Sequence, residues 1–317
     1  MNEAPVQDAP ESERVEVIMD AIEIVEVSAR DGLQNESVSF STEEKIRLIE
    51  GCVKGGVDRI EVASFVNPKR VPQMADGDSV IAGLSQAALS RSIGLVLNER
   101  GMQRAIEAGI PEINFVVVAT DTFADRNQSS TTEGLIKTWK TVARMAKESR
   151  IRTSVGISAA FGCPYEGEVS EDRVLWVLEQ IMESQPDEVG LADTIGSGVP
   201  KQVESMIRSA KRIMGNTKLR CHFHNTRNVG LANAYVAAAE GATALDSSLG
   251  GIGGCPFAPK ATGNIPTEDL VWMLQRSGFK VKADLVELMT TSAWLEGQLG
   301  RVMPSMVYRA GIFPPVS

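Results

Sequence analysis

The chain has 317 residues, of which 43% are hydrophobic and 23% charged. These proportions are typical of a globular protein, and the length fits either two average domains or one α/β barrel of roughly 250 residues with extensions. The net charge of −9 disfavours nucleic acids and anionic membranes as partners, because binding either needs an excess of lysine and arginine. No run approaches the roughly 18 apolar residues of a membrane span, so we expect a small-molecule substrate.

Residues 1–20 are acidic and polar, lack a hydrophobic period and are unlike a signal or transit peptide. We expect them to form a mobile extension, and we expect the protein to be cytoplasmic. The four cysteines, Cys52, Cys163, Cys221 and Cys255, lie far apart and form no CxxC pair. This spacing argues against a disulfide framework or a structural zinc site, so a functional cysteine would act as a thiol.

Eight short apolar runs recur along the chain, with enough residues between them for one helix and two loops. Helical patterns fill the gaps: residues 41–56 begin with a capping signal, and residues 171–184 and 199–215 have apolar residues at three- and four-residue intervals. Strands that alternate with helices pair in parallel, and eight of them close most simply into a (β/α)8 TIM barrel, although a doubly wound open sheet would use the same alternation. The predicted strands are residues 22–27, 57–62, 93–97, 113–119, 152–158, 187–193, 218–224 and 242–248.

The predicted catalytic barrel covers residues 21–265. Residues 266–317 are expected to form a C-terminal helical extension, because two further helical patterns follow the eighth run, at residues 267–278 and 284–300. We expect these two helices to pack on one end of the barrel.

Chemistry in such a barrel takes place at the carboxyl ends of the strands. The seventh run ends with the chain's only histidines, His222 and His224, and period-two alternation directs both imidazoles to one face, which in a barrel can be the lumen. A pair of structural histidines would show the same spacing. Asp31, after the first run, favours a metal site, because one aspartate and two histidines are a common minimal set for a divalent cation. Asn264, after the eighth run, can supply a further oxygen ligand.

Four other polar residues near strand ends are candidate catalytic groups. Arg30 precedes Asp31 and can act on a substrate, although a salt bridge that closes the barrel would leave the same sequence. Cys255 lies in the glycine-rich sequence GGIGGCP and is either an exposed thiol or a small buried hydrophobe. Glu61 and Asp193 are either functional carboxylates or solvated and capping ones.

Five segments together resemble the hydroxymethylglutaryl-CoA lyases, over roughly residues 22–300. These enzymes belong to the DRE-TIM metallolyases, a superfamily of metal-dependent barrel lyases and acyltransferases that also contains isopropylmalate and homocitrate synthases. The ArgAspGly element and the HxH pair belong to the whole superfamily, whereas GGCPFAPKATGN and the SFV–PK–VPQMAD segment point to the lyase branch. The segments are SARDGLQNE (28–36), EVASFVNPKRVPQMAD (61–76), GCPYEGEVS (162–170), LADTIGSGVP (191–200) and GGCPFAPKATGNIPTEDLVWML (253–274).

The resemblance implies a divalent-metal-dependent lyase that cleaves 3-hydroxy-3-methylglutaryl-CoA, or a close 3-hydroxyacyl-CoA, to acetyl-CoA and acetoacetate or the corresponding oxo acid, as in leucine degradation. It also implies Mg²⁺ or Mn²⁺ as the metal, Arg30 facing the thioester carbonyl, Cys255 as an acid/base on a mobile loop, and a homo-oligomer. The implied site residues are Asp31, His222, His224 and Asn264 for the metal; Arg30, Cys255, Glu61 and Asp193 for catalysis; and Gln34, Ser64 and Thr194 for substrate binding.

The loops that would hold the acyl group depart from the lyase pattern. Asn225 and Arg227 follow the HxH pair, where an acidic residue and a tyrosine are expected. Arg70 replaces an aromatic residue, and the loop that carries Asp121 is altered. Because such loops set specificity, the sequence predicts the reaction class more firmly than the acyl group. Candidates for binding the CoA phosphates are Lys69, Arg70 and Lys260.

Three other interpretations fit parts of the sequence. A synthase that condenses acetyl-CoA with a 2-oxo acid would share the metal ligands and Arg30, although no long regulatory domain follows residue 300. A non-haem iron oxygenase would place its carboxylate two residues from the first histidine, and this chain does not. A catalytically silent acyl-CoA-binding barrel would need a broken site, and every expected metal ligand is present.

Overall fold

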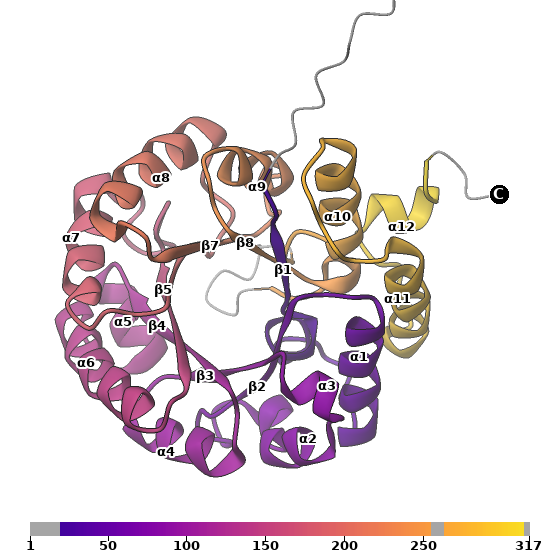
Figure 1. Ribbon diagram of the computed structural model, residues 1–317, viewed down its shortest axis with the longest axis horizontal. Helices are drawn as coiled ribbons and strands as arrows, with labels where there is room; N and C mark the ends of the chain where they lie inside the picture. Colours follow the sequence, from indigo (N-terminus) through magenta and orange to yellow (C-terminus); the bar gives the residue numbers. More distant parts are fainter. Residues whose placement is uncertain (1–19, 255–262, 314–317) are drawn as a thin grey trace, which may run out of the picture.

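The computed structural model describes residues 20–254 and 263–313. Eight parallel strands form a closed barrel in chain order, and β1 pairs with both β2 and β8 (Figure 1). The predicted barrel is confirmed, and each predicted strand overlaps an observed one. The strands are β1 (Glu23–Glu26), β2 (Arg59–Ser64), β3 (Ser92–Val96), β4 (Glu112–Val118), β5 (Arg152–Ser158), β6 (Glu188–Asp193), β7 (Lys218–Phe223) and β8 (Ala244–Ser247).

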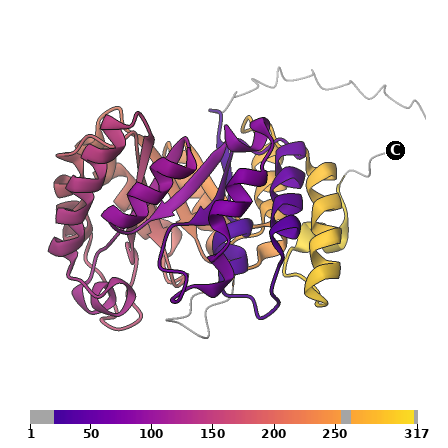
Figure 2. The ribbon, with the colours of Figure 1, turned by 90° about the horizontal axis from the view of Figure 1, so that it is seen from below.

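Helices surround the barrel and run beside its strands (Figure 2). The predicted capping signal is present: Ser41 and Glu44 form a capping box at the start of α1. None of the helices in the described ranges combines the length and apolar composition of a membrane span. The helices are α1 (Thr42–Lys54), α2 (Gly77–Gly83), α3 (Gln86–Leu89), α4 (Glu99–Ala108), α5 (Asp121–Gln128), α6 (Thr132–Glu148), α7 (Glu171–Met182), α8 (Pro200–Met214), α9 (Gly230–Ala239), α10 (Thr267–Arg276), α11 (Leu285–Leu299) and α12 (Met306–Ala310), with short turns η1 (Ser28–Gly32), η2 (Pro72–Met74) and η3 (Leu249–Gly251).

The C-terminal helices lie beside the barrel rather than on one end of it. Helix α10 follows β8 and packs against α9, so it takes the eighth helix position of the ring, which the boundary predicted at residue 265 assigned to the extension. Helix α11 packs against both α1 and α10 on the outside of the ring (Figure 1). The prediction was wrong on this point because an amphipathic pattern shows that a helix has a buried face but not which surface covers it.

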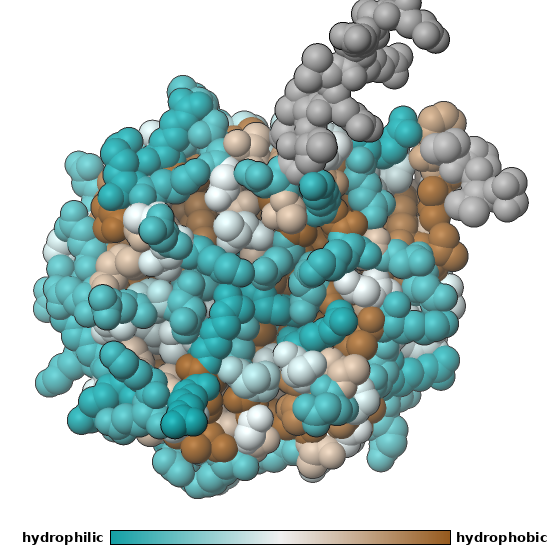
Figure 3. Space-filling model, viewed as in Figure 1, coloured by the Kyte–Doolittle hydropathy of each residue, from teal (hydrophilic) through white to brown (hydrophobic). Residues whose placement is uncertain are grey.

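One end of the lumen carries an ion-pair network formed by the first residues of four strands, three of which are buried. Arg59 of β2 donates hydrogen bonds to Glu112 of β4 at 2.7 Å and to Glu188 of β6 at 2.6 Å, and Arg152 of β5 also binds Glu112 at 2.8 Å. In the view down the barrel, hydrophilic residues cover the middle of the molecule instead of an open hydrophobic channel (Figure 3). We therefore expect a ligand to enter from the carboxyl ends of the strands.

A buried carboxylate of α10 holds the start of the glycine-rich loop in place. Glu268 of α10 is fully buried, and both of its oxygens accept the backbone N–H of Gly250 at 3.0 Å. The hydroxyl of Ser292 on α11 donates to the same carboxylate. Burial raises the pKa of Glu268 to about 7. In the folded protein the carboxyl group therefore stays protonated at pH values above 4.5, its ordinary pKa.

We expect this carboxyl group to make stability fall as the pH rises from 4.5 to 7. In that window the folded state binds more protons than the unfolded state, so the free energy of unfolding decreases with pH, by about 3 kcal/mol for a shift of this size. Urea unfolding at pH 4.5 and pH 8 should show a pH dependence in the wild type from which this contribution is missing in Glu268→Gln. The control is Glu133→Gln, which changes an exposed carboxylate. Equal pH dependence in wild type and Glu268→Gln would contradict the assignment.

Candidate active site

The turn η1, directly after β1, places Arg30 and Asp31 at the carboxyl end of the barrel. The N–H groups of Arg30 and Gly32 both donate to the carbonyl of Val27, at 3.2 and 3.0 Å. Gly32 allows close packing here, because a Cβ at this position would lie 2.8 Å from Ile252 in the glycine-rich loop. The turn therefore presents the two charged side chains and also supports that loop.

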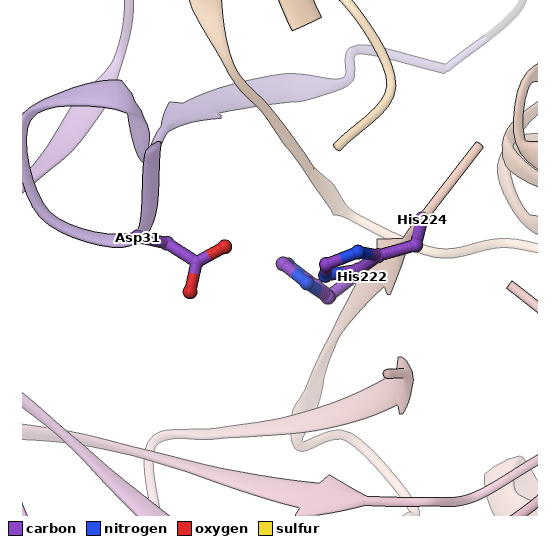
Figure 4. A group of neighbouring side chains, drawn as sticks. All are labelled: Asp31, His222 and His224. Carbon is purple, nitrogen blue, oxygen red and sulfur yellow. The ribbon is translucent and has the colours of Figure 1, made fainter. Parts of the chain in front are cut away.

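Asp31, His222 and His224 meet at this end of the lumen, as the sequence predicts. Their potential ligand atoms all lie within 4.8 Å of one another. The two imidazoles point from β7 and the residue after it toward the Asp31 carboxylate, which approaches from the turn after β1 (Figure 4). Groups from opposite ends of the chain thus form one arrangement that can hold a metal ion.

Asn264 lies beside this triad, because residue 264 forms a β-bridge with residue 224. Its Nδ2 donates to Asp31 at 2.8 Å, while its Oδ1 is buried and has no hydrogen-bond partner among the described residues. A buried carbonyl oxygen without a donor is costly unless a cation or water satisfies it. The donor set of two imidazoles, one carboxylate and one amide oxygen therefore fits a divalent cation.

Asp246 of β8 orients the first histidine. Its Oδ2 lies 3.0 Å from Nδ1 of His222, which leaves Nε2 to face the triad. Arg220 of β7 binds both oxygens of Asp246. Burial favours the neutral form of Asp246, but Arg220 and His222 outweigh it and lower the pKa of Asp246 to about 2. Asp246 therefore stays ionised and holds His222 in one orientation.

Arg30 is fixed by two carboxylates. Its Nε donates to Glu61 of β2 at 2.7 Å, and its Nη1 donates to Asp31 at 2.9 Å. Asn114 of β4 donates to the other oxygen of Glu61 at 3.2 Å. Burial raises the pKa of Asp31, but Arg30, followed by the two histidines, outweighs burial and lowers this pKa below its usual value. The guanidinium is therefore held in one position at the mouth of the lumen.

Asp193 lies at the end of β6, as expected, but its carboxylate is directed at the following loop. Its oxygens accept the backbone N–H groups of Ser197 at 2.8 Å and Gly198 at 2.9 Å. Burial raises the pKa of Asp193. The neighbouring Thr194 lines the cavity, and its hydroxyl accepts the N–H of Ala159 at 3.0 Å.

The site opens into a cavity of about 900 Å³. Of the remaining predicted residues, Gln34 and Arg70 line this cavity, whereas Ser64 is buried outside its lining. Cys255 and Lys260 lie outside the described residues. The lining also does not include Lys69, Asp121, Asn225 and Arg227.

Three of those residues instead form hydrogen bonds with the backbone that stabilise the loops. Asp121 accepts the N–H of Thr132 at 2.8 Å, Asn225 accepts that of Gly230 at 3.1 Å, and Arg227 donates to the carbonyl of Gly196 at 2.9 Å. Among the loop departures from the lyase pattern, Arg70 is therefore the one whose side chain lines the cavity. Its Nη2 lies 3.4 Å from the hydroxyl of Ser129 across the cavity mouth.

The sequence interpretation missed Asn114, Arg220 and Asp246. All three line the cavity. Period-two alternation carried two residues back from His222 would have found Arg220 on the lumen face of β7. Asp246 occupies the corresponding face of β8, where a single carboxylate in a short apolar run gave no distinct signal.

A closed parallel barrel with two imidazoles, a carboxylate and a buried amide oxygen in its open end belongs to the class of (β/α)8 barrels whose lumen carries a set of potential metal ligands. The HMGL-like family model matches residues 21–295. The chain is 40% identical to the (R)-citramalyl-CoA lyase of Chloroflexus aurantiacus, over 94% of this chain and 98% of that protein. It is 37% identical to a hydroxymethylglutaryl-CoA lyase of Bacillus subtilis, over 90% and 95% of the two chains.

Among solved structures, a hydroxymethylglutaryl-CoA lyase of Acinetobacter baumannii in complex with coenzyme A and 3-methylmalate matches with a TM-score of 0.89 and 36% identity. The match covers 94% of this chain and 97% of that one. The chain belongs to the HMGL-like family, a family of lyases. The predicted resemblance is thereby confirmed.

Proposed function

We propose that the protein is a divalent-metal-dependent carbon–carbon lyase for a 3-hydroxyacyl-CoA whose acyl group carries a free carboxylate. The substrates we propose are 3-hydroxy-3-methylglutaryl-CoA and the shorter citramalyl-CoA. The observation that supports this most is the grouping of Asp31, His222 and His224, with Asn264 hydrogen-bonded to Asp31 and Arg30 fixed beside it. The named relatives support the same reaction class.

The proposed cation is Mg²⁺ or Mn²⁺, because a mixed set of oxygen and imidazole ligands suits these ions better than a tetrahedral zinc site. When bound, it would polarise the substrate hydroxyl and lower the cost of removing its proton. Asp31, His222, His224 and Asn264 would hold it. Asp246 would keep His222 in the tautomer that offers Nε2.

Cleavage needs two proton transfers, one from the hydroxyl and one to the enolate carbon. A base takes the hydroxyl proton, the O–H electron pair forms the C=O bond of the ketone at C3, the C2–C3 bond breaks, and its electron pair passes to the thioester as an enolate. Arg30 is proposed to compensate this developing charge, and Glu61 to hold its guanidinium in place. A group with this role commonly contributes on the order of 3–4 kcal/mol to the barrier. Acetyl-CoA forms when a proton reaches the enolate carbon.

Cys255 is proposed as the proton donor. A thiol with an ordinary pKa near 8.5 is suited to this exchange. We expect Cys255→Ser to lower kcat by about 10² and thiol alkylation to inactivate the wild type unless substrate is present. The control is Cys52→Ser, because Cys52 is buried away from the cavity. Near-normal turnover by Cys255→Ser would move the search for the proton donor to other groups.

The function is tested by mass-spectrometric product analysis over a panel of 3-hydroxyacyl-CoA esters with Mg²⁺ or Mn²⁺. We expect 3-hydroxy-3-methylglutaryl-CoA to yield acetyl-CoA and acetoacetate, and citramalyl-CoA to yield acetyl-CoA and pyruvate. The two should differ by about 10- to 200-fold in kcat/KM if one methylene decides the fit. Equal cleavage of 3-hydroxybutyryl-CoA, which lacks the carboxylate, would contradict the proposed binding mode. Condensation of acetyl-CoA with a 2-oxo acid, without cleavage, would identify a synthase.

A further inference from the structure

Below the triad, five residues from four neighbouring strands form what we call the lumen floor: Asn114, Ser154, Gly156, Gly190 and Arg220. All of them line the cavity. Gly156 pairs with Gly190, and Gly190 pairs with Arg220, so two glycines stand in one row beside the arginine. Barrel lumens are ordinarily filled by layers of bulky side chains, and the two glycines leave space in the row that Arg220 shares.

Two buried donors of the lumen floor have no hydrogen-bond partner among the described residues. Arg220 is 3% exposed, and its Nη1 has no hydrogen-bond partner among the described residues, although its Nε and Nη2 bind Asp246. The hydroxyl of Ser154, 1% exposed, is likewise without a partner there. Leaving a charged N–H unsatisfied in a buried site costs several times the net value of an ordinary hydrogen bond. The floor therefore offers donors that an anionic acceptor would satisfy.

The charges of the site also favour an anion. Two guanidiniums, Arg30 and Arg220, stand against three carboxylates, Asp31, Glu61 and Asp246. A divalent cation held at the triad would turn the net charge of this group from −1 to +1. Asp246 links Arg220 to the triad, because Nη2 of Arg220 and Nδ1 of His222 both contact Oδ2 of Asp246.

We propose that the lumen floor binds the free carboxylate of the acyl group, with Arg220 Nη1 and the Ser154 hydroxyl as its donors. Arg220 is thus a specificity-determining residue, which selects acyl-CoA esters with a distal carboxylate over those that end in a neutral group. The inference rests on the proposed function, since it takes an acyl-CoA as the ligand. It adds a protein contact for the carboxylate, separate from the four residues proposed to hold the metal.

The test uses acyl-CoA esters that lack the 3-hydroxyl and so are not cleaved: glutaryl-CoA and succinyl-CoA, each compared with its terminal amide. Titration calorimetry with Mn²⁺-loaded protein measures the dissociation constants. We expect the wild type to prefer carboxylate to amide by about 10- to 100-fold for at least one chain length, and Arg220→Gln to retain a preference of about threefold or less. A preference that is absent in the wild type, or unchanged in Arg220→Gln, overturns the inference.

A matched control is Arg59→Gln. Arg59 is a second buried arginine of the same lumen, but it lies in the ion pairs at the closed end and outside the cavity lining. This variant should keep the wild-type preference for carboxylate over amide. If both arginine variants lose the preference equally, Arg220 acts only by maintaining the barrel, and the inference is wrong.

Gly156→Ala tests the same site without removing a charge. A Cβ at Gly156 would have no heavy atom nearer than 3.9 Å, so the fold should accept it while the methyl group enters the floor. We expect glutaryl-CoA or succinyl-CoA to lose at least about 10-fold more affinity than acetyl-CoA, which has no distal carboxylate. Equal losses of affinity for acetyl-CoA and for the two carboxylate esters would contradict the inference. This test remains valid if Arg220→Gln does not fold. Absence of lyase turnover with the carboxylate preference intact would instead reject the proposed function alone.

Discussion

Removal of divalent cations with EDTA abolishes carbon–carbon cleavage, and Mg²⁺ or Mn²⁺ restores it: this is the largest effect that we expect. The four proposed ligands come from residue 31 at one end of the chain and residues 222–264 near the other, and only closure of the barrel brings them together. Without a cation, the substrate hydroxyl keeps an ordinary alcohol pKa and is not deprotonated near neutral pH. Full turnover of chelator-treated protein would refute the metal assignment.

Substitution of a ligand separates metal binding from folding. His224→Ala should weaken Mn²⁺ binding, measured by calorimetry, and lower kcat by about 10³ or more, because the ion contributes several kcal/mol. Asp31→Asn should act in the same direction. Its control is Asp78→Asn, since Asp78 forms an ion pair with Arg104 on the surface, far from the triad in the fold. Circular dichroism should show all three variants folded.

Arg30→Met should lower kcat by about 10²–10³ and leave the metal content unchanged. The guanidinium is proposed to act on charge that develops during cleavage, so the loss should appear mainly in kcat rather than in KM. Arg30→Lys should recover only part of the rate, because an ammonium group cannot contact Glu61 and Asp31 with the same planar geometry.

The control for Arg30→Met is Arg208→Met, which removes an exposed guanidinium that pairs with Glu240 on the helix surface. This variant should keep the wild-type kcat and metal content. A normal kcat for Arg30→Met would leave Arg30 as a residue that merely closes the barrel through its ion pairs. Loss of metal from Arg30→Met would instead show that it acts by keeping Asp31 in place.

Local patterns in the sequence predicted the architecture well. Each strand is a short apolar run, and each run is followed by a helical period, so the eight βα units could be counted without any long-range information. The HxH spacing likewise places His222 and His224 on one face of a strand by geometry alone. Asp31 could be assigned to the same site because the carboxyl ends of all strands meet at one end of a barrel.

The remaining features depend on which groups face one another across the barrel, and a one-dimensional pattern does not contain that information. Asp193 stands at a strand end like Asp31, yet its oxygens are taken by two backbone N–H groups of its own loop. Asp246 and Arg220 form an ion pair in the lumen only because β7 and β8 are neighbours with a particular register. Helix α10 likewise takes its place in the ring through its packing against α9, which its own sequence pattern does not specify. The sequence determined the barrel and the histidine pair because these follow from local periodicity, whereas the tertiary structure alone decided the partners of each buried charge, because hydrogen bonds form between strands that are far apart in the chain.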